Sequence, residues 1–267
     1  MTVAFLIAVD CIRALLHKRL LIALMLVTLG LTVGFSMLLD RSLEFMQGVQ
    51  EQAIESQEGE MSEAEIQEIR SGLDMAGPFL LGAFFWMAMF GGQLVALYIC
   101  CTAVSGDIRS GTIRIVLAKP VSRDQFLLGK FCGAVIVMLA YSALIGAAIV
   151  AFTHANDLDA NTAAHHAPWL MFCQILVVGS VGMLLSLLIH PLLAGVAAFF
   201  ASASLLSSPN PLYFILPSYD RFNVTHSILT GEMIDLEDVL LLTAYAVDVA
   251  AIMMLLALWR FRTREVA

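Results

Sequence analysis

Apolar residues in this chain gather into six long runs, and polar residues gather between them. The runs are Leu20–Leu39, Phe79–Val104, Cys132–Phe152, Trp169–Ile189, Pro191–Ser207 and Val239–Trp259. A membrane core about 30 Å thick needs about 20 apolar residues in each helix that crosses it. Barrel strands would instead alternate polar and apolar positions over about ten residues. The pattern predicts an all-α membrane protein with six transmembrane helices in a single transmembrane domain, residues 1–267.

Composition excludes the two main alternatives to a membrane protein. The chain is 60% hydrophobic and 13% charged, whereas an ordinary soluble domain is about 25% charged. Disordered chains are also poor in apolar residues and rich in charge. The formal net charge of −8 argues against nucleic acid as a partner.

The basic residues orient the chain. Eleven of the 14 lysine and arginine residues lie in the N-terminal arm, between the second and third spans, or after the last span. With six spans these three segments share one side, and basic residues accumulate on the cytoplasmic side. Both termini are therefore expected in the cytoplasm, and the chain is expected to be a multi-pass protein of a cell membrane, most simply a bacterial inner membrane.

Two segments at the membrane surface carry distinct patterns. In residues 1–19, Asp10, Arg13 and His17 recur on one face of an otherwise apolar segment, which favours an amphipathic interfacial helix; the alternative is an inward extension of the first span. In residues 208–238, an apolar run bounded by prolines is too short to span, which predicts a partly re-entrant external segment.

The longest segment between spans, residues 40–78, is an external acidic loop with ten acidic and two basic residues. Ser62 and Glu65 have capping-box spacing, which predicts a short helix that ends near Gly72. The loop either docks an external or periplasmic protein or merely connects two spans.

The segment between the second and third spans, residues 105–131, mixes apolar side chains with five basic ones. Gly111-Thr112 and Lys119-Pro120 divide it into short pieces, and Ser122 is placed to cap the helix that enters the third span. A basic, amphipathic and segmented loop on the cytoplasmic face suits contact with a soluble partner.

This segment resembles the signature of type-2 ABC transporter permeases, near the group loosely linked to multicopper-enzyme maturation. Members carry an acidic-Arg-x-x-Gly-Thr run, then Pro-Val-Ser-Arg, and then Gly-Lys at the next span. In this chain the first motif corresponds to residues 107–112, the second to residues 120–123 and the third to Gly129-Lys130. The resemblance implies an ATPase-coupling contact made by Asp107, Arg109, Gly111, Thr112, Lys119, Pro120, Val121, Ser122 and Arg123. The alternative is that the basic residues only enforce topology.

The resemblance also implies the partners and cofactors. Two copies of a separate ABC ATPase subunit and a second permease copy, identical or closely related, would complete the complex within the bilayer. Gly129-Lys130 looks like the end of a phosphate loop, but Phe131 stands where that loop needs Ser or Thr. ATP and Mg²⁺ are therefore expected on the ATPase, and this chain is expected to bind no cofactor or metal.

Four polar residues inside the spans are candidates for a pathway or for intramembrane packing: Gln93, Gln174, Tyr245 and Asp248. An acidic group within a span is costly and is a functional hypothesis by default. The acidic residue Asp248 allows a second interpretation, in which the chain is a secondary transporter that uses this carboxylate. A third, an intramembrane enzyme built on Ser180, requires a histidine nearer than His190, which lies about 15 Å away along one helix.

Overall fold

The computed structural model describes residues 2–16, 63–109, 121–155, 162–201, 217–230 and 232–263, with Gly111 and scattered positions between 19 and 48. All regular structure in these described ranges is helical. The helices are α1 (Thr2–Leu16), α3 (Glu63–Ala103), α4 (Ser105–Arg109), α6 (Arg123–Ala155), α7 (Thr162–Ser186), α8 (Pro191–Phe200), the 3₁₀ helix η2 (Tyr219–Phe222), α10 (Thr225–Thr230) and α11 (Leu236–Thr263).

Four of these helices are long and apolar enough to cross a bilayer. The candidate spans are Leu81–Ile108, Arg123–Ala151, His165–Ser186 and Leu236–Thr263. They coincide with four of the six predicted windows. The first predicted window falls mostly outside the described residues, and of the fifth the structure describes α8 and Ala201.

Helix α7 is the centre of the bundle. It packs against α3, α6, α8 and α11, and all residues from 170 to 183 are buried. Small residues permit this close packing. A side chain added at Gly179 would meet Met138 and Cys100 within 3.0 Å, and the Cys101 thiol donates to the Gly182 carbonyl oxygen at 3.4 Å.

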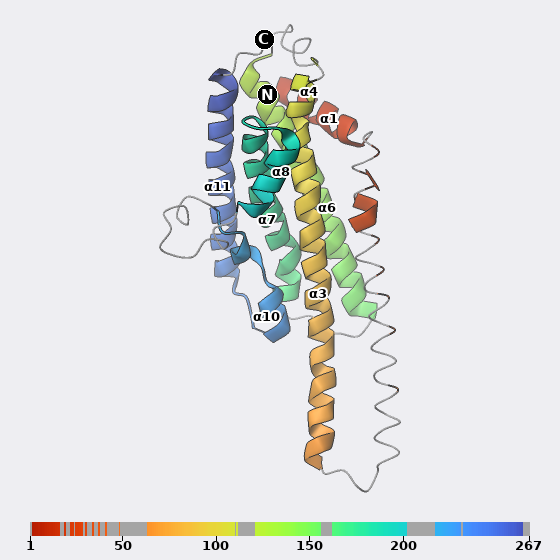
Figure 1. Ribbon diagram of the computed structural model, residues 1–267. Coiled ribbons are helices and arrows are strands. Elements are labelled where there is room, and N and C mark those ends of the chain that lie inside the picture. The colour runs from red at the N-terminus through yellow and green to blue at the C-terminus, as the bar shows by residue number, and fades with distance from the viewer. Residues whose placement is uncertain are drawn as a thin grey trace.

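One sequence prediction on the external side is wrong. The helix that was expected to end near Gly72 begins as predicted, at Glu63, but continues through Gly72 and Pro78 into the span as the 41-residue helix α3. A glycine costs a helix only about 1 kcal/mol relative to alanine, and the apolar run beyond it favours continuation. As a result α3 projects past the other labelled helices at one end of the bundle (Figure 1).

At the opposite end lie α1, α4, the start of α6 and the end of α11 (Figure 1). We call this the basic end, because Arg123, Lys130 and Arg262 are there, and the other the acidic end. Helix α1 falls within the segment 1–19 that was predicted to be helical and packs across α6. A side chain at Gly133 would lie 2.9 Å from the Cys11 Cβ and 3.0 Å from the Ala8 carbonyl oxygen.

Replacing Gly133 with valine should therefore displace α1. Overpacking of this kind costs about 1–3 kcal/mol, or about tenfold in the population of undocked helix. Cys11 is 2% exposed, so in a chain carrying Cys132→Ser its rate of maleimide labelling should rise. Ala140→Val, on the exposed face of the same helix, is the control. Equal labelling of Cys11 in both variants would contradict the packing.

Candidate functional site

Both described ends of segment 105–131 are anchored to the bundle. At its start, the Asp107 carboxylate forms an ion pair with Lys130 of α6, with 2.7 Å between Oδ2 and Nζ and both side chains mostly buried. Lys130 also lies over the Phe126 ring, 5.6 Å from its centroid. The Cys11 thiol of α1 donates to the Lys130 carbonyl oxygen at 3.7 Å. Helices α1, α4 and α6 therefore meet at Lys130.

Gly111 follows α4 in a backbone conformation that favours glycine. Its φ is +71°, in the left-handed region where a Cβ is crowded by the backbone. Its N–H donates to the Ile108 carbonyl oxygen at 3.3 Å. The predicted turn at Gly111 is thus a left-handed exit from α4.

A reciprocal cap begins α6. The Gln125 N–H donates to Ser122 Oγ, and the Ser122 N–H donates to Gln125 Oε1, both at 3.2 Å. This is a capping box, with glutamine in the third position. The prediction that Ser122 caps this helix is confirmed.

Replacing Ser122 with alanine should remove one half of this box. Loss of such an N-cap costs about 1 kcal/mol, so the free energy of unfolding in a detergent titration should fall by that amount. Ser122→Asp, which keeps an acceptor at the same position, should retain most of it. Equal stability of the alanine and wild-type chains would contradict the cap.

The first turn of α6 holds the last turn of α11. Arg123 Nη1 donates to the carbonyl oxygens of Phe261 at 3.4 Å and Arg262 at 3.3 Å. Asp124 accepts two hydrogen bonds from the Arg262 guanidinium, the one from Nε at 2.8 Å. The Phe126 and Phe261 rings stack with centroids 6.2 Å apart. We call these five residues the α6–α11 junction.

The junction gives Arg123 a structural contact within this chain. Asp107, Gly111 and Ser122 have the contacts and conformation given above, and the remaining five predicted coupling residues divide into two groups. Val121 packs partly buried against the core, whereas Thr112, Lys119, Pro120 and the Arg109 side chain lie outside the described positions. The contact of all nine with an ATPase stays a prediction.

The four polar residues predicted inside the spans separate into two places. Gln93 of α3 and Gln174 of α7 line one cavity of about 250 Å³ at mid-bundle, together with Asp220 and Asn223 of the segment at η2. Tyr245 and Asp248 lie elsewhere, on α11. The Tyr245 hydroxyl accepts from the Ser218 N–H at 3.1 Å, and Asp248 is exposed on its helix.

Tyr245 belongs to a small aromatic and basic cluster that fastens the segment around η2. Its ring lies 6.0 Å from that of Phe222, and the Arg221 guanidinium lies 5.4 Å over it. Tyr219 donates its hydroxyl to the Ala198 carbonyl oxygen at 3.1 Å. Burial, and secondarily the nearby Tyr245, raises the pKa of Tyr219 well above its ordinary value, so this hydroxyl stays a donor at any physiological pH.

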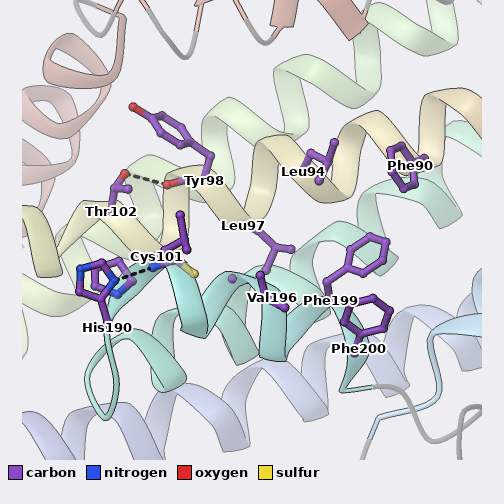
Figure 2. A pocket seen from close by; sticks show the side chains of 13 residues that line it. Phe90, Leu94, Leu97, Tyr98, Cys101, Thr102, His190, Val196, Phe199 and Phe200 are labelled. Carbon is purple, nitrogen blue, oxygen red and sulfur yellow. Dashed lines mark hydrogen bonds between the residues drawn. The ribbon is translucent and has the colours of Figure 1, made fainter.

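A larger groove of about 550 Å³ runs between α3 and α8. Figure 2 shows its apolar walls, among them Leu94, Leu97, Val196 and Phe199. Two of its polar side chains bond to nearby backbone: Thr102 donates to the Tyr98 carbonyl oxygen at 2.7 Å, and His190 Nδ1 accepts from the Leu192 N–H at 3.3 Å. The groove therefore presents mainly apolar surface.

The residues considered for an intramembrane enzyme have structural contacts. The Ser180 hydroxyl is buried and donates to the Val177 carbonyl oxygen of its own helix at 2.7 Å. His190 is the N-cap of α8, with Pro191 at the first helical position. Neither arrangement joins a nucleophile to a base.

Sequence reasoning missed several residues of these sites. Asp124 pairs with Arg262 across 138 positions of sequence, and Phe126 stacks on Phe261 across nearly as many. A single sequence carries no signal of such pairing. Asp220 and Asn223 fall in a polar stretch with no distinguishing pattern. Gln125 was missed as the partner of Ser122, although its capping-box spacing is a local signal that could have identified it.

A bundle in which four helices are long and apolar enough to cross a bilayer indicates a multi-pass membrane protein. Residues 5–228 match the sequence family described as ABC-2 family transporter protein. Because this match covers most of the chain, the chain belongs to the ABC-2 transporter family. Membership of this family supports a role as a membrane permease subunit of an ABC transporter.

A shorter match points the same way. Over 69 residues the chain is 36% identical to the probable ABC transporter permease protein NosY of Stutzerimonas stutzeri. The matched segment spans 26% of this chain and 25% of that protein.

Proposed function

We propose that this chain couples ATP hydrolysis by a separate ATPase subunit to export, or to mechanical work on an external partner. Two copies of the permease and two of the ATPase would form the complex. The observation that carries this proposal is the anchoring of segment 105–131 at both ends, through Asp107–Lys130 and through the α6–α11 junction. A docking loop that is fixed to the bundle on both sides can pass rigid-body motion to it.

The proposed route has two arms. Motion of the ATPase would reach α4, and from there α6 and α1, through the ion pair at Lys130. It would reach α11 through Arg123 and Asp124 at the first turn of α6. In this proposal Arg123 is a positioning residue inside the permease, and the predicted charged contacts with the ATPase fall to Arg109 and Lys119.

The proposed topology places the basic end in the cytoplasm. Six spans result when residues near 20–39 form the first, and α8 with the residues after it forms the fifth. The basic side chains at the start of α6 and the end of α11 support this orientation. A bacterial inner membrane is the simplest location, with the projecting part of α3 in the periplasm.

ATP and Mg²⁺ would bind on the ATPase alone. On the opposite side, residues 40–78 would contact an external or periplasmic protein if the complex works mechanically. The extension of α3 past the acidic end supports that arrangement (Figure 1). Deleting residues 43–62 would separate the two forms of the proposal, because mechanical work requires the loop whereas export of a cargo does not.

Co-expression with the ATPase tests the proposal. The permease should co-purify with it at two copies each, and ATP hydrolysis should depend on both. A secondary transporter is the alternative, since Asp248 lies within a span and carboxylates there mark ion routes in such proteins. Transport that persists without ATP in vesicles containing the wild-type chain would favour that alternative and overturn the proposal.

A further inference from the structure

The cavity that contains Gln93 and Gln174 has a polar group with no partner. The Gln174 side chain is 5% exposed, and its Oε1 atom accepts no hydrogen bond. Buried polar atoms in folded proteins nearly always have a partner, so each exception needs an explanation such as a bound molecule. Here the unpaired oxygen lies in the wall of a cavity of about 250 Å³.

The other polar groups of the cavity are a carboxylate, which accepts hydrogen bonds, and two amides, each with an accepting oxygen and a donating NH₂ group. Asp220 supplies the carboxylate, and Gln93 and Asn223 supply the amides. The Asn223 amide oxygen already accepts from the Thr225 N–H at 3.1 Å. Among the described residues that line the cavity, none is basic. The neighbouring Arg221 packs over the Tyr245 ring instead. The cavity therefore favours a ligand that donates hydrogen bonds and carries a positive charge.

Three aromatic rings and Met89 form the remaining wall. Trp86 and Phe90 of α3 stack with centroids 6.2 Å apart, and Phe199 of α8 meets the Phe90 ring edge-on at 5.7 Å. Figure 2 shows Phe90 and Phe199 approaching each other from the two helices, on the side of the neighbouring groove. Aromatic faces attract cations, most strongly on tryptophan. Carboxylate, amides and aromatic rings together are a combination that recognises an organic ammonium group.

We propose that this cavity binds a primary ammonium group on a short aliphatic stem, with its N–H donors on Gln174 and Asp220 and its charge against Trp86 and Phe90. The cavity is smaller than those that enclose drug-sized ligands, about 300–1,000 Å³, so it suits a head group or a small amine. The group belongs either to the ethanolamine head of a lipid or to a free amine. Binding is a property of this chain and does not depend on ATP coupling.

The test uses Trp86 as the reporter in the full chain. Trp169→Phe and Trp259→Phe leave it as the remaining tryptophan of the three, and the protein is placed in phosphatidylcholine nanodiscs, whose head groups have no N–H. Titration with n-propylammonium should change the Trp86 emission saturably. Tetramethylammonium, which lacks N–H donors, and propan-1-ol, which lacks charge, should bind at least about tenfold more weakly.

Variants separate this site from nonspecific uptake of amines. Gln174→Met keeps the side-chain length and removes the acceptor, and Asp220→Asn removes the charge at a surface position; each should weaken n-propylammonium at least about tenfold. Asp235→Asn, an exposed acidic residue of the same external segment, should leave binding unchanged. Phosphatidylethanolamine nanodiscs distinguish the sources, because a lipid ligand should change the Trp86 emission with no amine added.

Two results would overturn the proposal. One is that n-propylammonium causes no saturable change and that the Trp86 emission is identical in the two lipids. The cavity would then hold only water. The other is equal binding by wild type, Gln174→Met and Asp220→Asn. The Asp220 variant keeps the test decisive if the core variant fails to fold.

Discussion

Replacing Gly111 with valine should weaken the association with the ATPase. The backbone at Gly111 has φ +71°, and the left-handed region costs a residue with a Cβ about 1–2 kcal/mol, more when the side chain is β-branched. The chain would relieve this strain by leaving the turn that follows α4. The docking segment would then start in a different direction, and its affinity for the ATPase should fall by about tenfold or more.

Asparagine provides the matched control at the same position. It tolerates left-handed backbone better than other non-glycine residues, so Gly111→Asn should retain most of the co-purified ATPase, with Gly111→Ala between the two. The measurement is the amount of ATPase that co-purifies with each variant from the same co-expression. Equal recovery with valine and asparagine would show that the turn at Gly111 has no part in docking.

The double variant Arg123→Met, Asp124→Asn should still assemble with the ATPase, but α11 should no longer follow the motion of the ATPase. The variant loses the donors to the Phe261 and Arg262 carbonyl oxygens and the paired hydrogen bonds from the Arg262 guanidinium. Only the ring contact between Phe126 and Phe261 would remain at this junction among the contacts described. Substitutions along a coupling route change its energy by about 0.5–2 kcal/mol, and this variant removes both polar links at once.

The effect can be followed at the end of α11. Trp259 is 65% exposed in the penultimate turn of that helix, so a cysteine there, in a chain with Cys132→Ser, can carry an environment-sensitive dye. The four remaining cysteines are buried. ATP with vanadate should change the dye signal in the parent complex and change it much less in the double variant.

A charge control shows whether the junction is specific. Asp10→Asn removes an exposed carboxylate from α1 at the same end of the bundle, and it should preserve both the ATPase content and the dye response. If the double variant responds as the parent does, motion reaches α11 by another path. If the variant loses the ATPase as well, Arg123 contacts the ATPase, as the sequence predicted.

The sequence predicted the features that depend on local pattern. Four windows of apolar residues became helices of spanning length because about 20 consecutive apolar residues suffice to define such a helix. The cap at Ser122 followed from a serine placed directly before an apolar helical run. The end of the external helix at Gly72 was predicted wrongly, because a single glycine was weighed above the long helix-forming run that follows it.

The sites could be predicted only in part, because they join residues that are distant in the chain. Gln93 and Gln174 were each recognised as amides within a span, but their shared cavity depends on how α3 packs against α7. The Asp124–Arg262 pair likewise depends on where α11 ends relative to α6. Asp248 was predicted as a candidate because it lies within an apolar run of spanning length. It is exposed on α11 and does not line the cavity that holds both glutamines.

The most direct test of the coupling account is the dye response at position 259 in the complex with and without the ATPase. Permease reconstituted with the ATPase should show a change on addition of ATP and vanadate. Permease alone, and complex given ATP without Mg²⁺, should show none. A response of the permease alone, or no response of an actively hydrolysing complex, would contradict the claim that segment 105–131 passes ATPase motion to α11.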